Sequence, residues 1–160
     1  MNRRLAALLP LAALLAACAT SPARMPATVA DAVAHDPQLS TLHSLVSQAG
    51  LADTLKGAGP VTLFAPTNDA FKTLPARTMD ELAKDPARLK AVLAYHVLPT
   101  RLAAAEAKTA NVKTVQGSSV ALGRAGDFVT ADEAMVQVAD IAAGNGLIHK
   151  VDRVLMPPRR

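Results

Sequence analysis

Close to its C-terminal end the chain carries a histidine, His149, three residues before an acid, Asp152, in the stretch NGLIHKVDRVLMPP. A carboxylate that holds an imidazole in place can support general acid–base catalysis. The surrounding pattern is that of an extended strand, in which side chains three positions apart point to opposite faces. His149 would share its face with the apolar Leu147 and Val151. We therefore expect a packed, hydrogen-bonded structural histidine in a closing strand; the alternative is a ligand-binding residue.

Two other places carry side chains that could bind a partner. Tyr95 and His96 end an apolar helical stripe, and Asp140 and Ile141 precede an Asn-Gly turn signal. The tyrosine–histidine pair could tie the end of the helix to a sheet through a buried hydrogen bond. Asp140 could accept backbone N–H groups in its turn. Each place could equally be an exposed contact site, and both interpretations stay open at this point.

Other groups that could perform catalysis are missing from the sequence. It contains no Gly-x-Ser-x-Gly elbow, no His-Glu-x-x-His motif and no phosphate-binding loop. The four histidines lack the close spacing of metal ligands; they are His35, His43, His96 and His149. We expect no enzyme activity, no metal and no cofactor. The lone cysteine, Cys18, excludes an internal disulfide.

Composition argues against nucleic-acid binding. The chain has one Tyr, three Phe and no Trp, too few aromatic rings for a base-stacking or sugar-stacking surface. Its 17 basic side chains fall to 15 without Arg3 and Arg4, against 13 acidic ones, so the remaining net charge is only +2.

The first residues resemble a bacterial export signal. Arg3 and Arg4 form a basic start, and the apolar run 5–15 is too short to span a bilayer. The following LAAC at 15–18 resembles the lipobox of bacterial lipoproteins, which implies cleavage before Cys18 and a thioether lipid with an acylated amine on that cysteine. The alternative is an ordinary signal peptide with an incidental cysteine.

The expected organisation is a lipoprotein signal peptide over 1–17, a flexible tether over 18–27 and a single domain over 28–158. The tether is small, polar and Pro-bearing. Residue 19 is alanine rather than the aspartate that retains lipoproteins in the inner membrane of Gram-negative bacteria. If the source is Gram-negative, this favours the outer membrane within the cell envelope.

Helical signals fill the first half of the domain and strand signals the second. Helical periodicity covers 28–57, followed by a strand at 60–66 and a short helix that Thr67 caps, with Asp69 in its first turn. A further helix is predicted over 85–99 and one more over 102–110. Short alternating runs separated by glycines then predict antiparallel strands. This order indicates an α+β fold.

Three segments resemble the fasciclin domain: VTLFAPTNDAF (61–71), VLAYHVLP (92–99) and NGLIHKVDRVL (145–155). They occur in the family's order and separation. The resemblance implies a β-sandwich-like wedge of about seven strands, with several helices packed to one side. Residues of its structural motif would be Phe64, Thr67, Asp69, Phe71, Asn145, Gly146, His149 and Asp152. Candidate partner-binding residues would be Tyr95, His96, Asp140 and Ile141, because animal members use such pairs for integrin binding.

The resemblance also implies adhesion or extracellular binding rather than catalysis. We therefore expect a non-catalytic interaction module of the cell envelope, held to the membrane by its lipid, with a protein, matrix or polysaccharide partner. The alternative is an envelope enzyme or small-ligand carrier that uses the fold as a scaffold. A deep pocket with a perturbed carboxylate or histidine would favour the alternative, and a shallow surface with exposed apolar side chains would favour the interaction module.

Overall fold

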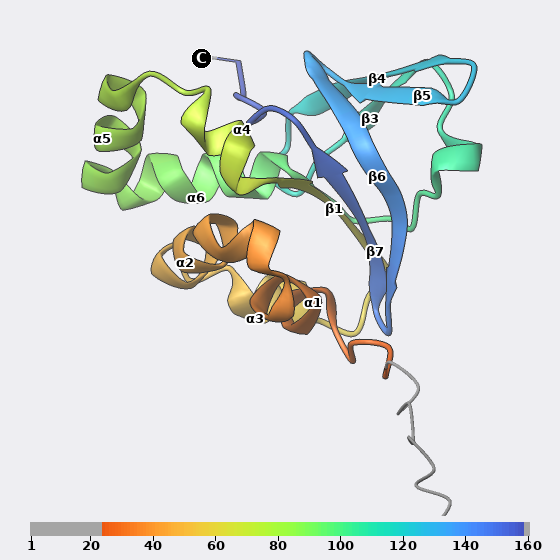
Figure 1. The fold of residues 1–160 in the computed structure, drawn as a ribbon, viewed down its shortest axis with the longest axis horizontal. Helices are drawn as coiled ribbons and strands as arrows, with labels where there is room; N and C mark the ends of the chain where they lie inside the picture. The colour runs from red at the N-terminus through yellow and green to blue at the C-terminus, as the bar shows by residue number, and fades with distance from the viewer. Residues whose placement is uncertain (1–23, 159–160) are drawn as a thin grey trace, which may run out of the picture.

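The computed structural model describes residues 24–158, in which helices gather on one side of a seven-stranded sheet (Figure 1). The expected signal peptide, Cys18 and most of the expected tether lie outside the described residues. Within residues 24–158, no helix has the length and apolar character needed to cross a membrane.

The N-terminal helical region is divided into short pieces. They are α1 (Val29–His35), the 3₁₀ turn η1 (Pro37–Leu39), α2 (Ser40–Gln48) and α3 (Ala52–Lys56). The first break falls at Asp36, because the residue before a proline disfavours the helical conformation. The second break lies at Gly50, whose φ of 68° is open to glycine without strain.

Strand β1 (Val61–Pro66) leads into three further helices: α4 (Asn68–Lys72), α5 (Ala76–Lys84) and α6 (Pro86–Tyr95). The Thr67 hydroxyl caps α4 by accepting from the Ala70 N–H at 3.3 Å. The Asp85 carboxylate caps α6, and Pro86 occupies the first helical position. Helix α5, which was not predicted separately, buries Leu82 and packs the partly buried Met79 against the core.

The sheet has the order β2-β1-β7-β6-β5-β4-β3. After β1 the strands are β2 (Val97–Leu98), β3 (Ala110–Lys113), β4 (Ser119–Ala125), β5 (Phe128–Ala131), β6 (Ala134–Ala143) and β7 (Gly146–Val151). All neighbours are antiparallel except β1 and β7, which run parallel. The helix expected at 102–110 is only a 3₁₀ turn, η2 (Ala104–Glu106).

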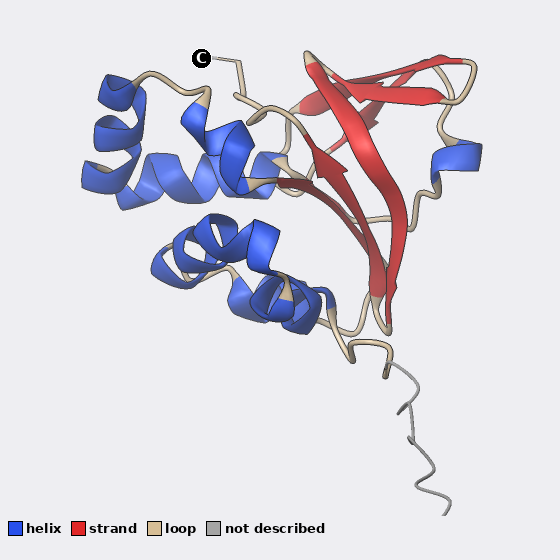
Figure 2. Cartoon of the chain, in the orientation of Figure 1, coloured by secondary structure: helices blue, strands red, loops and turns tan. Residues whose placement is uncertain are grey.

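The two edges of this sheet nearly meet. Just after β3, the Val115 N–H donates to the carbonyl of Val97 in β2 at 2.9 Å. The wall formed in this way has helices α1 to α6 on one side, with η2 apart from them (Figure 2). The predicted α+β class, the seven strands and the one-sided helices are therefore confirmed.

The core has two parts. One lies between the helices and the sheet and includes Leu42, Leu63, Phe71 and Ile148. The other lies inside the curve of the sheet and includes Phe64, Tyr95, Leu98, Val120 and Val151. Phe64 and Phe71 are 1% and 6% exposed.

The turn between β6 and β7 shows why glycine is needed there. The turn residues are Gly144 and Asn145, one position earlier than the predicted Asn145-Gly146, since Ala143 already pairs with Gly146. A Cβ on Gly146 would lie 1.9 Å from the Val61 carbonyl oxygen. Close approach of two backbones, rather than a positive φ, therefore requires this glycine.

Candidate functional site

His149 is a buried residue of β7, with 2% of its surface exposed. Its Nε2 donates to the Leu102 carbonyl at 2.7 Å, and its Nδ1 accepts from the Asp140 N–H at 3.1 Å. Because the Asp140 N–H can only donate, the imidazole is the neutral Nε2–H tautomer. Asp152 takes no part: its carboxylate accepts from the Met135 N–H at 2.7 Å. His149 and Asp152 thus form no catalytic pair.

Asp140 lies at an irregularity of β6 and has a φ of 56°, in the left-handed region. One carboxylate oxygen accepts from the Ala104 N–H at 2.8 Å, which helps to hold η2. Nearly half of the Asp140 side chain, 46%, is exposed. Its neighbour Ile141 is half-buried against the core between the helices and the sheet. Of this pair, Asp140 is the residue that a partner can reach.

Other side chains also hold the loop 100–106. The Thr62 hydroxyl donates to the Thr100 carbonyl at 2.7 Å and accepts from the Leu102 N–H at 2.9 Å. The Arg124 guanidinium donates to the Ala105 carbonyl at 2.6 Å. Each of four side chains therefore fixes a backbone group of this loop: Thr62, Arg124, Asp140 and His149.

Tyr95 is buried at the end of α6, with 2% of its surface exposed. Its hydroxyl donates to a carboxylate oxygen of Asp132 at 2.7 Å and lies 3.0 Å from the Ser119 carbonyl. Burial, followed by the nearby Asp132 carboxylate, raises the pKa of Tyr95 well above its ordinary value. The phenol therefore stays protonated and acts as a hydrogen-bond donor inside the protein.

His96 is completely buried. Its Nδ1 donates to the Val92 carbonyl at 2.8 Å, and its Nε2 accepts from the Leu155 N–H at 2.9 Å. Burial lowers the pKa of His96 to about 4, although the Val92 carbonyl and Asp132 favour the charged form. The Tyr95 and His96 rings are therefore buried and hydrogen-bonded within the domain, and neither presents an exposed face.

An open groove lies beside Tyr95, at the end of the molecule where β6 begins. It encloses about 550 Å³ and is lined by Asp132, Glu133, Arg153 and Met156, among others. Its lining mixes charged and apolar side chains. Within residues 24–158, no group of three or more His, Cys, Asp or Glu residues is placed to hold a metal ion.

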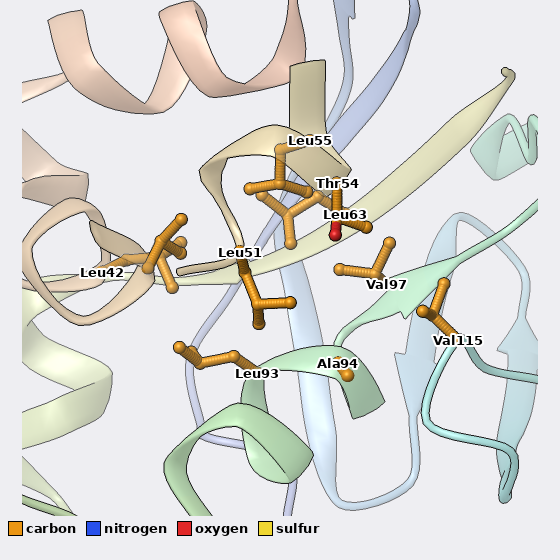
Figure 3. Close-up of a pocket in the computed structure, with 10 residues that line it drawn as sticks. Leu42, Leu51, Thr54, Leu55, Leu63, Leu93, Ala94, Val97 and Val115 are labelled. Atoms are coloured by element: carbon orange, nitrogen blue, oxygen red, sulfur yellow. The ribbon is translucent and has the colours of Figure 1, made fainter. Parts of the chain in front are cut away.

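A second pocket lies between the helices and the sheet (Figure 3). Side chains from α2, α3, β1 and α6 converge on it, and apart from Thr54 they are apolar, among them Leu42, Leu51, Leu63 and Leu93. Its volume of about 10 Å³ is about the space of one water molecule. It is an imperfection of core packing, too small for a metabolite.

The sequence did not point to Asp132, Thr62 or Arg124. Asp132 has a φ of 50° in the β5–β6 turn, where aspartate tolerates the left-handed conformation. That turn could have been read from the sequence. The hydrogen bond between Asp132 and Tyr95, 37 residues away, depends on how the sheet curves, and nothing in the sequence predicts it.

The chain resembles several known proteins. The family model of the fasciclin domain matches residues 37–157. The chain is 37% identical over 133 residues to Protein sll1483 of Synechocystis, covering 82% of this chain and 74% of that protein. It is 38% identical over 139 residues to Immunogenic protein MPB70 of Mycobacterium bovis, covering 81% and 69%. It is also 36% identical over 135 residues to Cell surface glycolipoprotein MPB83 of the same species, covering 81% and 60%.

A solved structure has the same fold. It is a FAS1 domain pair from the insect cell adhesion molecule fasciclin I, with a TM-score of 0.66 and 17% identity, covering 82% of this chain and 52% of that one. The likeness extends over the sheet and the helices described above. With the match of the family model over most of residues 24–158, these similarities show that the chain belongs to the fasciclin-domain family.

Proposed function

We propose that this fasciclin domain is a lipid-anchored, non-catalytic interaction module of the bacterial cell envelope. Relatives named as a cell surface glycolipoprotein and an insect cell adhesion molecule support a place outside the cytoplasm and a role in contact. The LAAC segment supports a lipid on Cys18. Ala19 favours the outer membrane if the source is Gram-negative.

One observation carries the non-catalytic part: the three aromatic and imidazole side chains that could do acid–base chemistry, those of Tyr95, His96 and His149, are buried and committed to hydrogen bonds. His96 and His149 each donate through one ring nitrogen and accept from a backbone N–H through the other. The phenol of Tyr95 donates to Asp132. A general base needs access to its substrate and a pKa near the working pH. Burial removes that access from all three residues and lowers the pKa of His96 to about 4.

The ligand-carrier alternative has less support. Small-molecule sites in proteins commonly enclose several hundred Å³ and bury most of the ligand. The apolar pocket of about 10 Å³ is far below this size, and the groove of about 550 Å³ is an open depression. A shallow surface is better suited to a macromolecular partner.

Exposed apolar side chains on β5 and β6 support the interaction role. Phe128 is 63% exposed and Met135 is 43% exposed. Aromatic side chains and Met are enriched at protein interfaces. We place the partner contact at these two residues.

The experiment is cross-linking in living cells that express the full chain. The bait is wild type, and the comparison is Phe128→Ser combined with Met135→Ser. Arg77→Ser, which replaces a 91% exposed side chain on α5, is the matched control. Wild type and control should cross-link one envelope partner that the double variant loses. Equal cross-linking by all three, or turnover of an envelope metabolite by wild type alone, would overturn the proposal.

Anchoring is tested separately with Cys18→Ser. Wild type should fractionate with membranes and carry lipid on Cys18 by mass spectrometry, since several acyl chains bind membranes firmly. Cys18→Ser should leave the membrane fraction or remain unprocessed. A processed Cys18→Ser protein that fractionates like wild type would exclude the lipid anchor.

A further inference from the structure

The start of the domain is tied to the turn between β6 and β7. The Gly144 N–H donates to the Pro26 carbonyl at 2.9 Å. The Val29 N–H, at the start of α1, donates to the Asn145 side-chain oxygen at 2.7 Å. A Cβ on Gly144 would lie 2.4 Å from the Ala27 carbonyl oxygen, so the two segments are in close contact. The chain therefore leaves the domain at a fixed point, the tip of the β6–β7 hairpin (Figure 1).

This fixed point lies close to the expected lipid in sequence. Pro26 lies eight positions after Cys18. A chain extends at most about 3.3–3.6 Å per residue, so Pro26 stays within about 28 Å of Cys18 whatever conformation these residues adopt. A lipid on Cys18 would hold the β6–β7 tip near the membrane surface.

We propose that the anchored domain stands with its β6–β7 tip against a phospholipid surface and carries the groove beside Tyr95 on its outward end. This inference rests on the lipid anchor proposed above. Strand β6 sets the separation of the two ends: its ten residues, at about 3.3 Å each, span about 30 Å. Figure 1 shows β6 running from the end near the described C-terminus to the hairpin tip.

The side chains at the tip suit a headgroup surface. The Asn145 side-chain amide donates to the carbonyls of Leu55 and Gly57, both at 2.8 Å, which places Lys56 beside the turn. Lys56 and Arg24 are exposed bases, and anionic lipids attract such side chains. The exposed Asp53 of α3 offsets part of this attraction.

Uncharged residues also lie near these bases, and two exposed acids lie at the opposite end of β6. Met25 is 60% exposed, and the loop before β1 exposes Ala58, Gly59 and Pro60. At the far end of β6, Asp132 and Glu133 are exposed. Headgroups of anionic lipids would repel these carboxylates, and the exposed Arg153 beside them offsets part of this repulsion. The orientation therefore rests mainly on the short tether.

The test uses the lipidated full chain in vesicles of phosphatidylethanolamine and phosphatidylglycerol. Cysteine is introduced singly at Ala58 beside the tip, at Glu133 on the far end, and at Asp127 in the β4–β5 turn. The thioether on Cys18 leaves the new cysteine as the only free thiol. Each variant is labelled with a fluorophore, and quenching by a headgroup nitroxide lipid is measured.

We expect the headgroup nitroxide to quench the fluorophore at Ala58→Cys. It should not quench the fluorophore at Glu133→Cys, which lies about 30 Å further away along β6. Equal quenching at the three positions, or the strongest quenching at Glu133→Cys or Asp127→Cys, would overturn the orientation. Flotation of the vesicles separately reports anchoring. A chain that does not float refutes the anchor and the orientation together, whereas a floating chain with the wrong quenching order refutes the orientation alone.

A longer tether tests whether the short segment between Cys18 and Pro26 causes the orientation. A Gly/Ser insertion of about twenty residues after Ser21 adds about 70 Å of reach. Quenching at Ala58→Cys should then fall while flotation persists. Unchanged quenching would overturn the short tether as the origin of the orientation.

Discussion

The Nε2 atom of His96 accepts a hydrogen bond from the Leu155 N–H at 2.9 Å, across 59 residues of sequence. The other ring nitrogen donates to the Val92 carbonyl one turn back in α6. One buried imidazole therefore joins the end of a helix to the segment that follows the last strand.

Removing this connection should destabilise the fold. His96→Ala leaves the Leu155 N–H and the Val92 carbonyl without their partner and opens a cavity. An unsatisfied buried group costs about 1–3 kcal/mol, and the cavity adds to this cost. The urea midpoint should fall accordingly. His43→Ala, at an exposed histidine of α2, is the control and should stay within about 0.5 kcal/mol of wild type. Equal midpoints for the two variants would exclude a stabilising role for His96.

The same histidine predicts a pH dependence. Burial lowers the pKa of His96 in the folded state to about 4, from an ordinary value of 6.5. Between these values the unfolded chain binds the extra proton, so stability rises with pH there. The contribution should be fully present above pH 6.5 and disappear as the pH falls toward 4, with a slope of at most about 1.4 kcal/mol per pH unit. Urea unfolding at several pH values measures it. His96→Asn should flatten this slope, and an unchanged slope would assign it to other groups.

Three phenylalanines offer a matched comparison. Phe64 and Phe71 are buried, whereas Phe128 is 63% exposed. Truncation of a buried Phe to Ala costs about 3–5 kcal/mol. Phe64→Ala and Phe71→Ala should therefore lower the melting temperature strongly, and Phe128→Ala should leave it nearly unchanged. A similar loss at all three positions would show that Phe128 also packs in the folded protein.

Gly146 should tolerate no side chain. Its added Cβ would lie 1.9 Å from the Val61 carbonyl oxygen, in the parallel pairing of β1 with β7. Overpacking of this kind costs about 1–3 kcal/mol or more. Gly59→Ala is the control, because no atom lies within 4 Å of its added Cβ. The melting temperature of Gly146→Ala should be lower than that of Gly59→Ala. Equal melting temperatures would show that β1 and β7 are further apart at this position than the structure has them.

The parts of this fold that the sequence predicted are those that depend on neighbouring residues. Thr67 and Asp85 cap helices where their types and positions predict caps, because capping depends only on neighbouring residues. The parallel pairing of β1 with β7 had no such signal, since its partners are about 85 residues apart. Among the short alternating runs, AMVQVADI (134–141) predicted a strand but not its irregularity at Asp140.

The functional residues divide in the same way. Face alternation in a strand separated His149 from Asp152, and the structure gives each a different partner. What His149 does bind, the loop at Leu102, depends on the path of the chain after β2 and could not be read from its neighbours. The same is true of the bond between Tyr95 and Asp132.

The last prediction concerns the independence of His149 and Asp152. His149 holds the loop at Leu102 and the Asp140 N–H, whereas the Asp152 carboxylate holds the Met135 N–H. His149→Ala should cost about 1–3 kcal/mol and speed hydrogen exchange at the Asp140 amide. Asp152→Ala should speed exchange at the Met135 amide only.

Because the two residues share no partner, their stability effects should add to within about 0.5 kcal/mol in the double variant. Urea unfolding of wild type, both single variants and the double variant measures this. A coupling well above that limit would join His149 and Asp152 in one network and return the pair to consideration as a site of acid–base chemistry. Additive losses, with exchange rising at two separate amides, would establish the last strand as a closing element that is fastened independently at two points.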